Sequence, residues 1–392
     1  MTSAHASLDR FAAGKLAGLD RRNLRRHLQE TRPLGGARVE RKGQRLVNAC
    51  SNDYLGLAQH PDVIEAACTA SRTYGAGSGA SRLVTGGHPL LFELERRLAA
   101  FKQTEDCVIF GSGYLANLAI TPALAGKGDL VLVDALAHAC LHAGARLSGA
   151  RVETFKHNDM TDLADQLSTL RSSHRRALIL TDGVFSMDGD LAPLPDLLAL
   201  AERHDAWALV DDAHGVGVIG EGRGTAHAFT PPALAPLQMG TLSKALGSYG
   251  GYVCASRSVC ELLRTRARPL VFTTALPPAC IAAALAALDL IENDPALRER
   301  PMLLAQRFCR SLGLAAPRSP IVPILIGSET AALQASAQLE SAGFLVTAIR
   351  PPTVPRGTSR LRITFSAAQD EADVDRLARS LKTILQTAEA AE

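Results

Sequence analysis

The sequence predicts an α/β fold: a large domain with a mostly parallel seven-stranded sheet, followed by a smaller α+β C-terminal domain. Between residues 107 and 255, short apolar runs alternate with amphipathic segments of helical period, such as 194–204. Strands that alternate with helices are typical of a parallel sheet covered on both faces. The expected strands are 107–110, 130–133, 152–155, 177–181, 207–210, 237–240 and 251–255.

The segments on either side of this alternation have different patterns. Residues 1–45 are basic and helix-favouring, and they predict a helical arm that becomes turn-rich near Pro33. The large domain is expected over residues 46–284 and the small domain over residues 285–392. In the small domain the pattern predicts strands at 321–326, 345–348 and 361–364 and helices at 330–342 and 371–386.

The composition is typical of a soluble enzyme. The 392 residues are 47% hydrophobic and 21% charged, and the net charge of +3 is too small to indicate nucleic-acid binding. The eight cysteines form no C-x-x-C pair and no zinc-like spacing with histidine, so we expect no metal site, reduced thiols and a cytoplasmic protein. The longest apolar stretch, 281–291, contains Asp289 and is too short to cross a bilayer.

Lys244 is the first candidate for chemistry. It is the one lysine in Gly240-Thr241-Leu242-Ser243-Lys244-Ala245-Leu246-Gly247, where its neighbours are small. A lysine in such a setting can condense with an aldehyde, although many lysines in Ser/Gly segments are simply solvated. The chemical interpretation is favoured by a pair of carboxylates about thirty residues upstream.

These carboxylates, Asp211 and Asp212, end the apolar run 207–210. A carboxylate at a strand end can hold a protonated ring nitrogen, and the alternative role is helix capping. Neighbouring side chains of a strand point to opposite faces, so only one of the two can face a ligand, and we predict Asp211. Together with Lys244, this arrangement suggests a pyridoxal 5′-phosphate (PLP) enzyme with a Schiff-base lysine.

Polar residues also follow other strands of the predicted sheet. The small residues of Gly111-Ser112-Gly113 open a helix, where backbone N–H groups can bind a phosphate. His138 could stack on a pyridine ring, and Ser186 and His214 could bond its phenolate oxygen. Each of these residues has an ordinary role in a loop or turn as its alternative. Since ligands of open α/β sheets bind at the carboxyl ends of the strands, convergence there predicts one site.

Five motifs and one C-terminal run carry a family resemblance. The chain resembles the α-oxoamine synthases, which are fold-type I PLP enzymes, over nearly its whole length from about Leu19. The run Ile349-Arg350-Pro351-Pro352-Thr353-Val354-Pro355-Arg356-Gly357-Thr358 is most similar to the branch that serves biotin synthesis. The motifs are Ser51-Asn52-Asp53-Tyr54-Leu55-Gly56-Leu57, Gly75-Ala76-Gly77-Ser78-Gly79-Ala80-Ser81-Arg82, Gly183-Val184-Phe185-Ser186-Met187-Asp188-Gly189-Asp190, Val210-Asp211-Asp212-Ala213-His214-Gly215 and Thr241-Leu242-Ser243-Lys244.

The resemblance implies roles for individual residues. Lys244 would carry PLP, Asp211 would hold its ring nitrogen, and His138 would stack on the ring. Ser186 and His214 would contact the phenolate oxygen. The residues implied around the phosphate and ring are Gly113, Tyr114, Thr241 and Ser243, and Thr273 and Thr274 would reach the phosphate of the neighbouring subunit of a homodimer.

The substrate residues implied by the resemblance come from several segments. Arg362 would pair with the amino-acid carboxylate, for which a planar guanidinium is suited. The others are Asn52, Ser78 from across the interface, Ser81, Arg350 and Thr353, with either Arg25 or Arg26 contacting the acyl donor. Ser81 is expected to face the substrate Cα and to leave room for a methyl group.

The implied reaction is a decarboxylative condensation of L-alanine with pimeloyl-CoA or a pimeloyl-acyl carrier protein. The resemblance leaves open which carrier is used. Within the family the alternatives are glycine-using enzymes, 5-aminolevulinate synthase and 2-amino-3-ketobutyrate CoA ligase. From another class, the alternative is a non-catalytic subunit of a heterodimer, which the presence of Lys244, Asp211 and His138 disfavours. Neither nucleic acid nor a membrane is expected as a partner.

Overall fold

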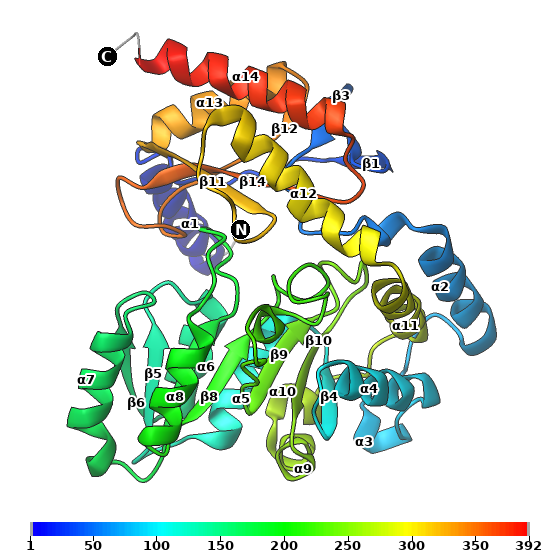
Figure 1. The fold of residues 1–392 in the computed structure, drawn as a ribbon, viewed down its shortest axis with the longest axis vertical. Helices are drawn as coiled ribbons and strands as arrows, with labels where there is room; N and C mark the ends of the chain where they lie inside the picture. The colour runs from blue at the N-terminus through cyan, green and yellow to red at the C-terminus, as the bar shows by residue number, and fades with distance from the viewer. Residues whose placement is uncertain (1–2, 390–392) are drawn as a thin grey trace.

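The centre of the structure is a seven-stranded sheet. The computed structural model describes residues 3–389, and its sheet has the order β4-β10-β9-β8-β7-β5-β6 (Figure 1). Only β10 runs antiparallel to its neighbours, so the prediction of a mostly parallel sheet is confirmed. The strands are β4 (Asp106–Phe110), β5 (Leu130–Asp134), β6 (Arg151–Phe155), β7 (Ala177–Asp182), β8 (Trp207–Asp211), β9 (Leu237–Thr241) and β10 (Gly251–Ala255).

Helices cover both faces of this sheet because its strands are apolar on both sides. In β4, for example, Val108 and Phe110 belong to one hydrophobic cluster while Cys107 and Ile109 belong to another. The first cluster packs under α5 (Gly113–Leu124), α6 (Ala139–Ser148) and α9 (Arg257–Arg266). The opposite face lies against α4 (Pro89–Phe101), α7 (Met160–Leu170), α8 (Leu194–Arg203) and α11 (Pro278–Asn293), and α2 (Pro61–Tyr74) packs on α11.

A smaller unit lies beyond the carboxyl ends of the parallel strands (Figure 1). Its antiparallel sheet has the order β11-β14-β13, built from β11 (Ile321–Gly327), β13 (Thr347–Ile349) and β14 (Ser359–Thr364). Three helices pack on it: α12 (Pro295–Leu312), α13 (Glu329–Ser341) and α14 (Glu371–Glu389). The expected strand 345–348 is divided, because Phe344–Leu345 forms β12 of another sheet before Thr347 begins β13.

The N-terminal segment differs from the predicted helical arm. It is helical in α1 (Ser3–Asp20), whereas β1 (Arg32–Gly35), β2 (Arg38–Arg41) and β3 (Gln44–Asn48) form a four-stranded sheet with β12. Gly35 and Gly36 adopt positive φ values of 102° and 54°, which turn the chain back after Pro33 so that β1 pairs with β2. The predicted boundaries at 45/46 and 284/285 fall inside β3 and α11, and the division into domains stays a prediction.

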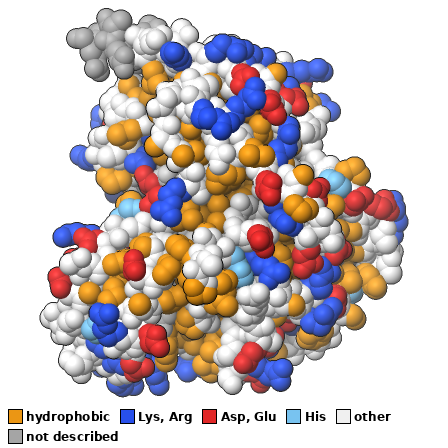
Figure 2. All heavy atoms as spheres, in the orientation of Figure 1, with side chains coloured by type: hydrophobic (Ala, Val, Ile, Leu, Met, Phe, Trp, Pro, Cys, Tyr) orange, Lys and Arg blue, Asp and Glu red, His pale blue; other side chains and the backbone are white. Residues whose placement is uncertain are grey.

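The surface carries both signs of charge. On the face shown in Figure 2, Lys and Arg side chains are interspersed with Asp and Glu over both units. No helix within residues 3–389 is long and apolar enough to cross a membrane. The two short helices α3 (Arg82–Thr85) and α10 (Arg268–Val271) leave large apolar side chains beside them exposed, including Leu83, Val84 and Phe272.

Candidate active site

Lys244 follows the carboxyl end of β9, in the turn that leads to β10. Its Nζ lies 2.7 Å from Nε2 of His214. Burial lowers the pKa of Lys244 to about 8, although Asp211 and Asp182 act in the opposite direction. A lysine with this pKa is substantially a neutral amine at mildly alkaline pH, the form that attacks an aldehyde or accepts a proton.

Asp211 and Asp212 point to opposite sides of the sheet, as strand alternation predicts. Asp211 accepts a 2.6 Å hydrogen bond from Nδ2 of Asn117 and a 3.0 Å bond from the N–H of Ala213. Asp212 is buried against Nζ of Lys102 at 2.8 Å and accepts from Thr225 Oγ1 at 2.6 Å. Asp212 therefore belongs to an internal ion pair, and Asp211 is the carboxylate on the side of Lys244.

His138 caps the N-terminus of α6 and lies at the same carboxyl-end edge of the large sheet. Its backbone N–H donates to Oδ1 of Asp182 at 3.1 Å, and its Nδ1 lies 2.7 Å from Sγ of Cys140. Burial lowers the pKa of His138, so the ring is neutral and suited to stacking on another ring. Burial, reinforced by Asp211, raises the pKa of Asp182 well above its usual range.

A cradle of small residues lies where α5 begins. Ser112 caps this twelve-residue helix, and its first N–H groups have no partner within the helix. A Cβ added to Gly113 would lie 2.9 Å from Cε of Met239 and 3.4 Å from Cβ of Thr241, so only glycine leaves this space open. Thr241 is held by a 2.8 Å bond from its Oγ1 to the carbonyl of Gly250. The cradle and the amine of Lys244 fit a small aldehyde that bears a phosphate.

Arg362 of β14 reaches the same group of residues from the small unit. Its Nη2 donates to Oδ1 of Asn52 at 3.1 Å and to Oη of Tyr54 at 3.4 Å. Tyr54 Oη in turn lies 2.7 Å from Nδ1 of His214. Burial, with the nearby positive charge of Lys244, lowers the pKa of His214 well below its usual range. A continuous series of contacts thus joins Lys244 to Arg362 through a neutral histidine and a buried tyrosine.

Some predicted residues lie away from this group, among them Ser78, Ser81, Thr273 and Thr274. Ser78 Oγ donates to the carbonyl of Leu276 at 2.6 Å, and Ser81 caps α3 by accepting from the N–H of Leu83 at 3.2 Å. Thr274 is exposed, and Thr273 lies beside Gly111 in a small recess. All four lie near the exposed apolar side chains of the α3 and α10 region, which include Val84 and Phe272.

Residues predicted to contact the acyl donor lie beside a cavity of about 800 Å³. One of its walls contains His138 and Ser186, and the opposite wall contains Thr353 and Arg360. Arg26 Nη2 donates to Oγ1 of Thr353 at 2.8 Å, and Arg350 donates to the carbonyl of Asn23. Arg25 instead pairs with Asp20 at 2.8 Å. Thr353 therefore lines the cavity that also contains His138 and Ser186, and Arg26 is bonded to it there, whereas Arg350 is not among the lining residues.

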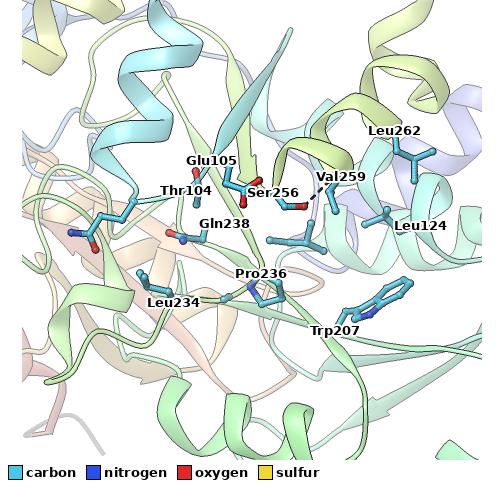
Figure 3. A pocket seen from close by; sticks show the side chains of 14 residues that line it. Thr104, Glu105, Leu124, Trp207, Leu234, Pro236, Gln238, Ser256, Val259 and Leu262 are labelled. Atoms are coloured by element: carbon cyan, nitrogen blue, oxygen red, sulfur yellow. Dashed lines mark hydrogen bonds between the residues drawn. The ribbon is translucent and has the colours of Figure 1, made fainter.

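A second cavity, of about 570 Å³, lies at the opposite edge of the sheet. Trp207 and Leu237, the first residues of β8 and β9, line it together with Leu234, Pro236 and Leu262 (Figure 3). None of the residues predicted to act on a cofactor or substrate lines it. Chemistry is thus concentrated at the carboxyl ends of the strands.

Several residues of this site were not predicted from the sequence. Tyr54 lies within the motif 51–57, but no role was predicted for it. No pattern in the sequence pointed to Asp182 or Cys140. Asn117 follows Gly113 by four residues, which places both on one face of α5, and this spacing could have indicated it. The internal pair of Lys102 with Asp212 gave no local signal, because its residues are 110 positions apart.

Comparison with known proteins agrees with this fold. The family model described as aminotransferase class I and II matches residues 44–381. An 8-amino-7-oxononanoate synthase of Maricaulis maris is 79% identical over 392 residues, covering all of both chains. A serine palmitoyltransferase structure from S. paucimobilis with a bound PLP–myriocin adduct has a TM-score of 0.91 at 29% identity, covering 98% of this chain and 99% of that one. An 8-amino-7-oxononanoate synthase structure from Francisella tularensis has a TM-score of 0.73 at 27% identity, covering 88% and 98%.

The chain belongs to the class I and II aminotransferase family, and it has the fold-type I architecture of PLP enzymes. PLP is its cofactor, as Lys244 and the cradle at Gly113 had indicated. Within this family it is an 8-amino-7-oxononanoate synthase, a PLP-dependent acyltransferase of biotin biosynthesis. The sequence prediction of fold, cofactor and enzyme class is confirmed, and the glycine-using and non-catalytic alternatives are set aside.

Proposed function

We propose that the enzyme condenses L-alanine with a pimeloyl thioester and releases CO2 and the free thiol carrier. The observation that supports this most directly is the contact series from Lys244 through His214 and Tyr54 to Arg362. The series links an amine of lowered pKa to a guanidinium, and this pair suits an α-amino acid, whose carboxylate a guanidinium can bind. The acyl carrier is coenzyme A or acyl carrier protein.

In this proposal each residue has a defined task. Bound PLP supplies an electron sink for the carbon that loses a proton. Lys244 binds the cofactor, and its freed amine removes the Cα proton of alanine and later returns one. Asp211 holds the proton on the ring nitrogen, while Asn117 and the N–H of Ala213 orient its two oxygens. His138 would stack on the ring, and Ser186 and His214 would contact its phenolate oxygen.

Arg362 and Asn52 orient the alanine carboxylate. The guanidinium is already held by Asn52 and Tyr54 and by the carbonyl of Ser186, so its direction is set before the substrate arrives. Such preorganisation lowers the entropy lost on binding and directs the Cα–H bond of alanine towards Lys244. The small unit thereby supplies substrate recognition, and the large unit supplies proton transfer.

The test of the proposed reaction is thiol release from pimeloyl-CoA with glycine, L-alanine or L-serine. Alanine should give thiol and 8-amino-7-oxononanoate in equal amounts. Glycine and serine should give much slower release, and thiol release that is independent of the amino acid would contradict the proposal. Replacement of the donor by pimeloyl-acyl carrier protein in the same assay compares the two carriers.

We further propose that the enzyme is a homodimer with shared active sites. Val84 and Phe272 are 77% and 72% exposed, and such large apolar side chains clustered on a surface usually mark an interface. Ser78, Thr273 and Thr274 lie in the same region, so a second copy docked there would bring them towards the partner's cofactor. Sedimentation of the purified holoenzyme should give twice the mass of the chain, and a monomer with full activity would refute the arrangement.

Ser81 is proposed to select alanine over glycine. Threonine also caps helices, so Ser81→Thr should keep the bond from Leu83 while its extra methyl fills the space for the alanine methyl. We expect the ratio of kcat/KM for alanine over glycine to fall about tenfold. The control is Ser81→Ala, which loses the cap but keeps the space and should retain the preference for alanine. An unchanged ratio in a folded, PLP-loaded Ser81→Thr enzyme would limit Ser81 to capping.

Arg26, rather than Arg25, is proposed to contact the acyl donor. Arg26 bonds Thr353 at the cavity, whereas Arg25 is held by Asp20. Arg26→Ala should raise the KM for pimeloyl-CoA about tenfold, as expected for a lost charge-assisted contact, while Arg25→Ala should change it little. Steady-state kinetics at saturating alanine make the comparison, and a larger effect of Arg25→Ala would reverse the assignment.

A further inference from the structure

His157 lies between two carboxylates and outside every motif described above. It follows β6 by two residues, and its ring nitrogens contact carboxylates from different segments. Nδ1 is 3.0 Å from Oδ1 of Asp134, the last residue of β5, and Nε2 is 2.9 Å from Oδ2 of Asp190. Ionised carboxylates only accept hydrogen bonds, so both ring nitrogens must donate and the ring is an imidazolium.

We call the arrangement of His157 between Asp134 and Asp190 the clamp. Neighbouring residues reinforce it. Asn158 donates from its backbone N–H to Oδ2 of Asp134 at 2.9 Å and from Nδ2 to Oδ2 of Asp190 at 2.8 Å. The edge of the His157 ring packs against Phe185, with ring centroids 4.3 Å apart at 87°. Asp134 is fully buried. A cation between two carboxylates, one of them fully buried, offsets charge that would otherwise be costly to keep inside the protein.

Asp190 lies near the end of the segment 183–191, and residues 185–188 of this segment line the cavity of about 800 Å³. The segment is closed on itself, because the N–H of Phe185 donates to the carbonyl of Asp190 at 3.0 Å. The carbonyl of Ser186 accepts from Nε of Arg362, and Asp188 pairs with Arg360. Asp190, which His157 holds, is therefore joined through this short segment to Ser186, which supports the guanidinium of Arg362.

We propose that His157 is a positioning residue for the amino-acid substrate. As a permanent cation it holds Asp190 against Asp134, and through the segment 183–191 it keeps Ser186 over the cofactor and Arg362 in its substrate-binding direction. This inference rests on the proposed role of Arg362 in binding the alanine carboxylate. No contact of His157 with substrate or cofactor is required.

The charge of His157 is maintained over the working pH range. Burial alone would lower the pKa of His157, but the hydrogen bonds and charges of Asp134 and Asp190 raise it to about 10. The other titratable groups near the pair are His142 of α6, whose pKa burial lowers, and Asp182 of β7, whose pKa burial raises. Because the folded pKa is raised, this stabilisation is complete below a pH of about 6.5 and is lost as the pH rises through about 10.

The test uses the PLP-loaded enzyme and the change in PLP absorbance on addition of L-alanine. In His157→Gln, Asp134 and Asp190 face each other without a cation, and at pH 8.5 the affinity for alanine should fall about tenfold. At saturating alanine, kcat should stay within about twofold of the wild type, because the base and the ring contacts are intact.

Two further variants make the result specific. In His157→Gln/Asp190→Asn a neutral pair can hydrogen-bond, so alanine affinity should recover. His174→Gln is the control, because the ring of His174 contacts only Leu170 and Ser173 among the described residues and should leave alanine affinity unchanged. If His157→Gln does not fold, Asp190→Asn serves instead, since its alanine affinity should decline at a lower pH than that of the wild type.

The possible outcomes are distinguishable. Wild-type alanine affinity in His157→Gln at pH 8.5, or a loss that the double variant does not reverse, would overturn the inference. A PLP-loaded wild type that does not respond to alanine would overturn the proposed substrate as well. In that case the Tm of the wild type and His157→Gln, compared between pH 7 and 10.5, still tests the clamp, because their difference should shrink as His157 loses its proton.

Discussion

Replacing Lys244 with alanine should abolish turnover while leaving the fold intact. The amine is the proposed base and cofactor ligand, and loss of a positioned base reduces rates about 10²- to 10⁴-fold. The variant should still bind PLP through the cradle at Gly113 and the carboxylate of Asp211, but borohydride should no longer attach the cofactor covalently. Mass spectrometry of the reduced protein and a thiol-release assay measure the two effects.

The lowered pKa of Lys244 adds a pH signature to this prediction. In the cofactor-free wild type the neutral amine is the form that reacts with an aldehyde, and the pKa is about 8. The rate of PLP capture should therefore rise with pH and level off above about 8, whereas an unperturbed lysine would level off near 10.4. Lys127→Ala, at an exposed lysine, is the matched control and should behave as the wild type. A borohydride-trapped adduct on another lysine would contradict the assignment.

Asp211→Asn and Asp212→Asn should produce opposite defects. Asp211→Asn removes the charge proposed to hold the ring-nitrogen proton, so deuterium exchange at the alanine Cα should fall about 10²- to 10⁴-fold with little change in Tm. Asp212→Asn instead leaves the ammonium of Lys102 buried without its partner. That change should destabilise the fold by about 3–5 kcal/mol, while the folded fraction exchanges deuterium at nearly the wild-type rate.

The two variants control for each other because the substitution is the same and the positions are adjacent. NMR of alanine in deuterated buffer measures exchange, and thermal unfolding with PLP bound measures stability. Exchange that depends on Asp212 but not on Asp211 would mean that the side chains of β8 face the other way. Equal loss of stability in both variants would show that Asp211 is also chiefly a structural group.

Much of the fold could be predicted because its signals are local. β7 and β8 are short, continuous apolar runs bounded by polar turns, and such runs indicate buried parallel strands without knowledge of their neighbours. The site could be predicted for a related reason. Residues that follow successive parallel strands, such as His138, Asp211 and Lys244, meet at one edge of the sheet whatever the details of packing.

The strands β1 to β3 could not be predicted in the same way. They are only four or five residues long and partly exposed, so they carry no strong apolar run. What makes them a sheet is pairing, and β3 pairs with β12, where Phe344 lies opposite Val47 nearly three hundred residues away. Local composition favoured a helix, and a distant partner decided otherwise.

The sequence by itself determined the order of the elements of the large sheet, the lysine and aspartate proposed to bind PLP, and the family to which these motifs belong. Only the tertiary structure decided which side chains are free to act. Lys102 pairs with Asp212, so that Asp211 is the carboxylate left on the side of Lys244. Tyr54 contacts both His214 and Arg362. His157 lies between Asp134 and Asp190. The physical reason is range: backbone pattern is set by near neighbours along the chain, whereas the direction and charge of a buried polar group depend on partners that folding brings from far away.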